Sequence, residues 1–248
     1  PLHARRLQLR VHCSSATCHP LRATGKEVDF HTLLIRMNND RSDVPWAWIK
    51  RARDIVSVEH GFNQPMPVEL LPWLLLSDEM SVRNKRKLLD MEITHVLTVA
   101  GMPSFQREFL ASEFEAAGIE HKYVPGEDSE NYDMIDKHWD ECHRFIADAR
   151  DNGGRVVVHC MAGMNRSALI ACAAHMVLER TPVLEVLQNC VDKRGAVLFN
   201  KSFQAQLCEL ASKENLLGDK PHGYNDKPFR QTPLVRPPPS AALDRLFR

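Results

Sequence analysis

The residues best suited to do chemistry lie in one short segment, 155–167, which reads RVVVHCMAGMNRS. Its apolar, β-branched start predicts a buried strand that runs into Cys160, and a helix is expected to begin near Met164. A cysteine and an arginine six residues apart often occur together by chance. The match becomes rare when Gly163 and a serine directly after the arginine are also required. The segment is therefore a candidate active site.

A loop at the N-terminus of a helix is suited to bind an anion. Its backbone N–H groups point inward, and the helix dipole adds partial positive charge. Gly163 lets the backbone come close to the anion, and Arg166 can present two donors to two phosphate oxygens. We expect the following residues to bind phosphate: Met161, Ala162, Gly163, Met164, Asn165 and Arg166.

Cys160 stands at the base of this loop, where the same field favours its thiolate. A thiolate can attack phosphorus in line to form a thiophosphate, and peroxide oxidises such a cysteine most readily. Ser167 can donate a hydrogen bond to the sulfur and help it leave in a second step, and the ring of His159 can orient the loop. Because backbone amides and Arg166 stabilise the charge, this chemistry needs no metal and no cofactor.

A carboxylic acid should face the loop, because the leaving oxygen needs a proton and a water must later lose one. Four candidates follow a strand expected at 120–124, namely Glu127, Asp128, Glu130 and Asp133. Asp133 stands where a helix should begin, so its expected role is N-capping. Glu127 and Glu130 are expected to be solvated loop charges.

The elements that must position these residues alternate between short apolar strands and helical stretches. Gly118 should close one helix, and Gly153 should end the clearest one. This alternation favours an α/β fold with a central mixed sheet flanked by helices. Strands are expected at 68–71, 73–76, 95–100, 120–124 and 155–159, and helices at 80–91, 105–117, 132–150, 164–179, 182–193 and 201–216.

Composition divides the chain into four segments. A basic tail at 1–27 is expected to be disordered, and an N-terminal extension at 28–65 should contain a helix near 44–57 that packs on the main domain. A catalytic domain is expected at 66–217, followed by a Pro-rich tail at 218–248 with polyproline tendency.

The basic tail has two further interpretations. Its basic, acid-free composition is also found in organelle transit peptides, a weaker alternative to a disordered tail. It also contains possible metal ligands in His12, Cys13, Cys18 and His19. The four-residue gap between these two cysteines lies at the edge of the spacing seen in zinc sites, so a metal site is not favoured.

Charge and cysteine content restrict the class of protein. Lys and Arg total 32 and Asp and Glu total 32, so the net charge is zero and does not indicate a surface that binds nucleic acid. The longest apolar run, 168–178, is too short to span a membrane. The 7 cysteines are odd in number and widely spaced, which favours reduced thiols in an intracellular chain over a secreted disulfide framework.

The pattern H-C-x-x-G-x-x-R-S at 159–167 resembles the active-site motif of the protein tyrosine phosphatase superfamily. Within that superfamily the chain resembles the atypical dual-specificity phosphatases, and the likeness covers about 66–217. Residues 93–100 resemble that family's entry into the domain, and 194–207 resemble its closing helix. The resemblance implies a cysteine-phosphatase-like fold. It also implies hydrolysis of phosphotyrosine, phosphoserine or phosphothreonine in proteins through a phosphocysteine intermediate.

The resemblance also implies which carboxylic acid is catalytic. The family places an Asp in the loop after the fourth strand, about thirty residues before the nucleophile, and Asp128 lies 32 residues before Cys160. The implied partner is a phosphorylated protein, a protein kinase among the candidates, in the cytoplasm or nucleus and not at a membrane.

One departure keeps other functions open. Asn165 stands where many dual-specificity members have Ser or Gly, and Asn there also occurs in relatives that hydrolyse RNA 5′-triphosphates. An RNA 5′-triphosphatase would need a basic channel, which the neutral charge does not favour. A non-catalytic phosphate-binding scaffold would usually have lost Cys160 or Arg166, and both are present.

Overall fold

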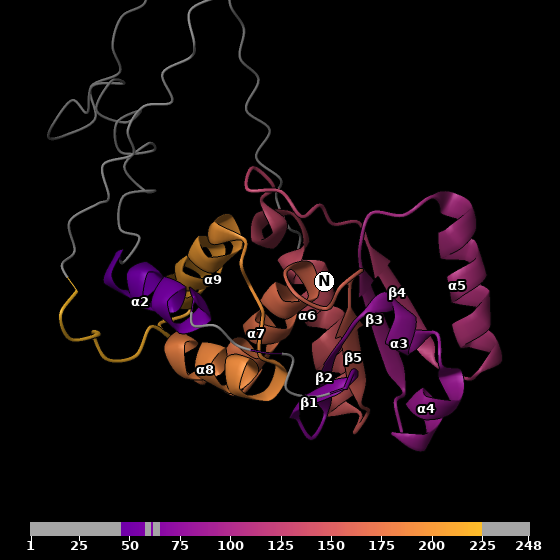
Figure 1. Ribbon diagram of the computed structural model, residues 1–248. Coiled ribbons are helices and arrows are strands. Elements are labelled where there is room, and N and C mark those ends of the chain that lie inside the picture. Colours follow the sequence, from indigo (N-terminus) through magenta and orange to yellow (C-terminus); the bar gives the residue numbers. More distant parts are fainter. Residues whose placement is uncertain (1–45, 58–60, 62–64, 225–248) are drawn as a thin grey trace, which may run out of the picture. The chain divides into compact units, whose positions relative to one another are not determined.

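A five-stranded mixed sheet forms the centre of the protein in the computed structural model, which describes residues 46–57, 61 and 65–224 (Figure 1). The strand order is β1-β2-β5-β3-β4, with β1 antiparallel to β2 and the other neighbours parallel. The strands are β1 (Val68–Leu71), β2 (Leu74–Ser77), β3 (His95–Val99), β4 (Glu120–Val124) and β5 (Val156–His159). All five expected strands are therefore confirmed.

The central strands are buried on both faces, as continuous apolar runs in a parallel sheet should be. Every residue of β2 and of β5 is buried. Because successive side chains of a strand point to opposite faces, Val156 and Val158 join one core cluster while Val157 joins the other. Helices must therefore cover both faces of the sheet.

Eight described helices surround the sheet, and their bounds largely match the expected ranges. They are α2 (Trp46–Ser57), α3 (Glu79–Val82), α4 (Lys85–Asp90), α5 (Ser104–Ala116), α6 (Met134–Asp151), α7 (Arg166–Leu178), α8 (Val183–Arg194) and α9 (Lys201–Lys213). In Figure 1, α5 lies on one side of the strands, whereas α6, α7, α8 and α9 lie on the other. The predicted α/β fold is confirmed.

One helix prediction was wrong, and the ends of the other helices differ from the expected ones by up to three residues. The single helix expected at 80–91 is two, because Asn84 interrupts it and its side chain accepts a hydrogen bond from the Lys87 backbone N–H, which caps α4. The helix expected from Met164 begins at Arg166, because the preceding residues form the loop after β5.

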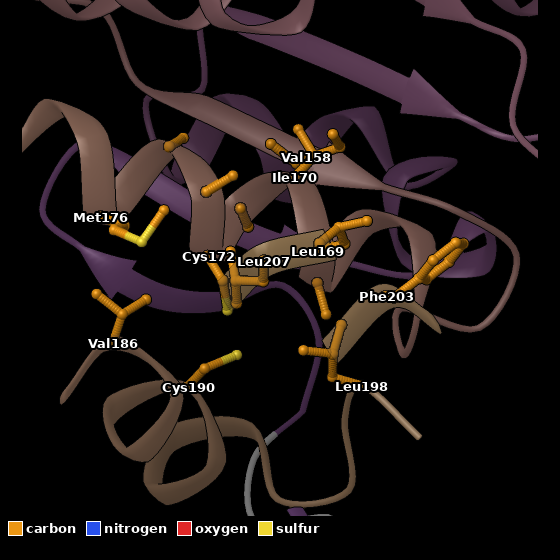
Figure 2. Close-up of a cluster of buried hydrophobic side chains, with 14 of the residues drawn as sticks. Val158, Leu169, Ile170, Cys172, Met176, Val186, Cys190, Leu198, Phe203 and Leu207 are labelled. Carbon is orange, nitrogen blue, oxygen red and sulfur yellow. The ribbon is translucent and has the colours of Figure 1, made fainter. Parts of the chain in front are cut away.

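The larger core lies between the sheet and the helices α7, α8 and α9. Helix α7 runs through its centre, and ten consecutive residues from Ser167 to Met176 are buried. Figure 2 shows the side chains of this cluster, with Ile170 of α7 near Val158 of β5 and with Cys172 facing Cys190 of α8. Burial on all sides fixes the position of α7 and hence of the loop that precedes it.

The expected N-terminal helix packs on the main domain. Helix α2 buries Ala47, Ile49, Ala52, Ile55 and Val56. It contacts α8 and α9, and the indole Nε1–H of Trp48 donates to the Leu217 carbonyl at 2.8 Å. This confirms the expected helix that packs on the main domain.

Several other predictions lie outside the described residues. They are the tail at 1–27, the possible metal ligands within it and the Pro-rich tail beyond residue 224. None of the described helices is long and apolar enough to cross a membrane.

Candidate active site

The loop at residues 160–166, here called the anion loop, joins β5 to α7. Its tight turn depends on Gly163, which has a φ of +63°. A Cβ at this position would lie 2.6 Å from the Met66 Cε and 2.8 Å from the Ser77 carbonyl oxygen. The methionine side chain can move, but the carbonyl belongs to β2 and cannot. Both the backbone angle and the space therefore require glycine.

Cys160 is the first residue of the anion loop, and its side chain is 2% exposed. The Ser167 hydroxyl donates to its Sγ at 3.1 Å. Burial alone would raise the pKa of the thiol, but hydrogen bonds from Ser167 and from the backbone of Met164 lower the pKa below its usual value. The positive charge of Arg166 acts in the same direction. The site thus favours a thiolate, the nucleophilic form of cysteine.

Arg166 connects the anion loop to the β4–α6 loop, residues 125–133, here called the acid loop. One of its terminal nitrogens, Nη1, donates to the Gly126 carbonyl at 3.2 Å. Its Nε is buried and has no hydrogen-bond partner among the described residues. A guanidinium anchored on one side, with a donor left over, can hold oxygens of a phosphoryl group.

His159 is fully buried at the end of β5 and links the anion loop to the sheet. Its Nε2 lies 2.6 Å from the Thr98 hydroxyl, and its Nδ1 lies 3.3 Å from the Cys160 carbonyl. Burial lowers the pKa of His159 to about 4, so the ring is neutral at pH 7. Because a carbonyl can only accept, Nδ1 carries the proton and Nε2 accepts from Thr98.

This hydrogen-bond chain continues to β4. The Thr98 hydroxyl lies 2.8 Å from Nε2 of His121, whose pKa burial lowers to about 4. Since the Thr98 hydrogen is given to His159, its oxygen accepts from His121. A neutral ring held in this way links the end of β5 to Thr98 of β3 and, through it, to His121 of β4.

Among the four acidic candidates, Asp128 is the one that contacts the anion loop. Its two carboxylate oxygens accept from the side-chain amides of Asn165 at 3.0 Å and Asn200 at 3.1 Å. Asp133 instead accepts from the Asp136 backbone N–H and caps α6, as expected. Glu127 and Glu130 are exposed.

A cleft of about 450 Å³ opens beside the anion loop. Sequence reasoning did not assign several of its lining residues, among them Asp78 and Arg194. The position of Asp78 could have been inferred, because it directly follows β2. The last residue of β2, Ser77, pairs with His159 in the adjacent parallel strand. Carboxyl ends of neighbouring parallel strands meet at one edge of a sheet, where ligands bind. The lining residues are Met66, Asp78, Met80, Met161, Ala162, Met164 and Arg194.

Arg194 is 4% exposed and belongs to the wall of this cleft. Burial lowers the pKa of its guanidinium, while the negative charge of Asp78 opposes that change. The side chain brings a second positive charge to the site besides Arg166. It comes from the end of α8, 34 residues beyond Cys160 and outside the motif at 159–167.

Comparison with known proteins agrees with this geometry. The family model described as "Dual specificity phosphatase, catalytic domain" matches residues 74–213. Human dual specificity protein phosphatase 5 is 32% identical over 158 residues, which are 64% of this chain and 39% of that protein. Dual specificity protein phosphatase 26 of Bos taurus is 33% identical over 148 residues, which cover 57% of this chain and 65% of that protein.

Solved structures show the same fold. Human DUSP28 matches with a TM-score of 0.53 at 22% identity, over 62% of this chain and 98% of that one. DUSP15 matches with a TM-score of 0.50 at 27% identity, over 64% of this chain and 97% of that one. These two solved structures are thus matched almost entirely, whereas the matched part spans about two-fifths of the length of human dual specificity protein phosphatase 5.

Proposed function

The chain belongs to the dual specificity phosphatase family, and we propose that it hydrolyses phosphate monoesters on proteins. The substrates are phosphotyrosine and phosphoserine or phosphothreonine side chains. The observation that carries this proposal is the buried Cys160, whose thiol pKa is lowered at the base of a loop that also holds Arg166.

In the first step the Cys160 thiolate attacks phosphorus. An S–P bond forms as the bond from phosphorus to the side-chain oxygen breaks, and Asp128 gives its proton to that oxygen. The backbone N–H groups of the anion loop and the guanidinium of Arg166 stabilise the charge on the other three phosphate oxygens. The dephosphorylated side chain leaves, and a cysteinyl phosphate remains.

In the second step water attacks the same phosphorus. The Asp128 carboxylate takes a proton from the water, an O–P bond forms and the S–P bond breaks. Ser167 already donates a hydrogen bond to the Cys160 sulfur, so it stabilises the departing thiolate. Inorganic phosphate leaves and the starting state is restored.

The proposal also covers the class of protein substrate and the cellular compartment. Phosphorylated protein kinases are a substrate class to test. The five cysteines of the described residues are all free, and the mechanism needs a reduced Cys160, which fits the cytoplasm or nucleus.

The test compares wild-type protein with Cys160→Ser on phosphotyrosine and phosphoserine peptides and on RNA with a 5′-triphosphate. Wild type should release phosphate from the peptides much faster than from the RNA. In the variant, phosphate release from the peptides should be slower by about a thousandfold or more, because a serine hydroxyl is hardly ionised at neutral pH. The variant should still bind inorganic phosphate. Near wild-type activity of the variant, or preference for RNA, would contradict the proposal.

A further inference from the structure

The side chain of Asn165 does not make the hydrogen bond that is usual for an asparagine at its position. Asn165 occupies the N-cap position of α7, where an asparagine oxygen ordinarily accepts from a backbone N–H of the first turn. Here the side chain makes no such capping bond. Its amide nitrogen, Nδ2, instead donates to Asp128 Oδ2 at 3.0 Å, across the mouth of the anion loop.

We propose that Asn165 is a positioning residue for the general acid, holding the Asp128 carboxylate over the nucleophile, with Asn200 as the second donor. This inference rests on the proposed function, in which Asp128 is the acid. It differs from the phosphate-binding role expected from sequence, because the Asn165 side chain contacts the acid and only its backbone remains for the phosphate.

The orientation of both amides is fixed by backbone donors. The Asn200 backbone N–H donates to Asn165 Oδ1 at 3.2 Å, so the other end of that amide, Nδ2, must face Asp128. Asn200 Oδ1 accepts from the backbone N–H groups of Ser202 and Phe203 and caps α9. Its Nδ2 therefore points outward and donates to Asp128 Oδ1 at 3.1 Å. Neither amide can be flipped without losing a bond to the backbone.

The anion loop thus holds the acid loop at two places. Asn165 holds Asp128, and the next residue, Arg166, donates to the carbonyl of Gly126, two residues before it. The segment before α9 is fastened to the same loop, since the Leu198 backbone N–H donates to the Met164 carbonyl at 2.8 Å. Three segments that are distant in sequence are therefore joined at the anion loop.

Such fastening matters because Asp128 is exposed and lies on a loop. A free carboxyl group would sample many orientations, and misplacement of a reacting group by about 1 Å can cost about a hundredfold in rate. Two donors, one on each oxygen, restrict the carboxyl group to one plane. They also stabilise the carboxylate that the first step leaves behind and that must then deprotonate water.

The primary test is Asn165→Ala, assayed on two aryl phosphates. Phenyl phosphate has a basic leaving oxygen that needs the acid, whereas dinitrophenyl phosphate departs with little help. We compare kcat/KM, which reports the steps up to departure of the leaving group and not the later attack of water, since Asp128 serves that second step with either substrate. We expect kcat/KM to fall about tenfold on phenyl phosphate and less than about twofold on dinitrophenyl phosphate. Inhibition by inorganic phosphate should not change, which would show that the anion loop is intact.

A second variant, Asn200→Asp, separates positioning from helix capping. Aspartate keeps the oxygen that caps α9 but lacks the amide donor, and it places a like charge beside Asp128. It should keep the thermal midpoint within a few degrees and show the same selective loss on phenyl phosphate. The matched control is Asn131→Ala, an exposed asparagine of the acid loop, which should leave both rates unchanged.

The assays distinguish a wrong assignment of the acid from a wrong assignment of the positioning role. If Asp128→Asn shows no selective loss on phenyl phosphate, the acid is misassigned and the proposed function fails at that residue. If Asp128→Asn shows this loss but Asn165→Ala lowers kcat/KM equally on both substrates or on neither, the positioning role is overturned. In an Asp128→Asn background, Asn165→Ala should have no further effect, because no acid is left to position. An additional loss there would also overturn the role.

Discussion

At the scale of single residues, Cys160 differs from the other four described cysteines in the groups around its sulfur. Burial raises the pKa of Cys142 and Cys208 to about 12, and a hydrogen bond with Cys190 together with burial raises that of Cys172. Cys160 is as deeply buried, but it has hydrogen-bond donors and a positive charge beside it. Redox sensitivity is therefore expected at Cys160 among these five cysteines.

The Ser167 hydroxyl should set part of this reactivity. Ser167→Ala removes a donor to the sulfur, so the pKa of the Cys160 thiol should rise. The rate at which iodoacetamide alkylates Cys160, measured against pH, should then reach half of its maximum at a higher pH than in wild type. Ser112→Ala, an exposed serine on α5, is the control and should leave the profile unchanged. A profile that stays in place or moves to lower pH in Ser167→Ala would contradict this role.

Arg166 should not tolerate replacement by lysine. A lysine ammonium is a point charge that cannot hold the Gly126 carbonyl and two phosphate oxygens together, as the planar guanidinium can. We expect Arg166→Lys to lower kcat/KM for a phosphopeptide by about a hundredfold. Arg86→Lys, an exposed arginine of α4, should have no effect. A loss of less than about threefold in Arg166→Lys would show that Arg166 is not the phosphate clamp.

At the scale of elements, the turn between β5 and α7 depends on space as well as backbone angle. Gly163 and Gly153 both have positive φ, +63° and +74°, but a Cβ on Gly153 would meet nothing within 4 Å. Gly153→Ala should therefore cost only about 1 kcal/mol of unfolding free energy. Gly163→Ala should cost about 3 kcal/mol or more, because the new methyl group also meets the Ser77 carbonyl.

Urea unfolding of the two glycine variants measures this difference, and phosphopeptide hydrolysis provides a second readout. Gly163→Ala should also lose activity, since the backbone N–H groups of the anion loop would be displaced. Equal unfolding free energies for the two variants would mean that the loop relaxes around the methyl group. That result would remove the steric argument for glycine.

At the scale of the whole molecule, α2 contributes stability without entering the site. Ile49 is 1% exposed and belongs to the larger core, whereas the lining of the cleft comes from other elements. Ile49→Ala should lower the unfolding free energy by about 2–5 kcal/mol, through lost burial and the cavity left behind. At temperatures where the variant is folded, kcat should match wild type.

The control for α2 is Ser57→Ala, an exposed change in the same helix that should alter stability by less than about 0.5 kcal/mol. Calorimetry and phosphopeptide kinetics on the full chain measure both effects. If Ile49→Ala leaves the unfolding free energy unchanged, α2 does not pack as described. If it lowers kcat in the folded protein, α2 influences the site.

The order of the elements and the chemistry of the anion loop could be predicted from the amino-acid sequence. Strand and helix periods are local properties, so β1 to β5 and most helices were expected within a few residues of their bounds. The motif from His159 to Ser167 is also local, because β5, the loop and α7 are consecutive in the chain. The candidate nucleophile, the arginine and the required glycine could therefore be identified from the order of residues alone.

Which side chains meet across the chain depends instead on tertiary packing. The contact of Asn165 with Asp128 joins residues 37 positions apart, and that of Asn200 with Asp128 joins residues 72 apart. Local periodicity carries no information about such contacts, since they depend on how α7, α9 and the acid loop pack around the sheet. The same packing brings Arg194 to the cleft and gives Asp128, rather than Glu127 or Glu130, its place beside the anion loop.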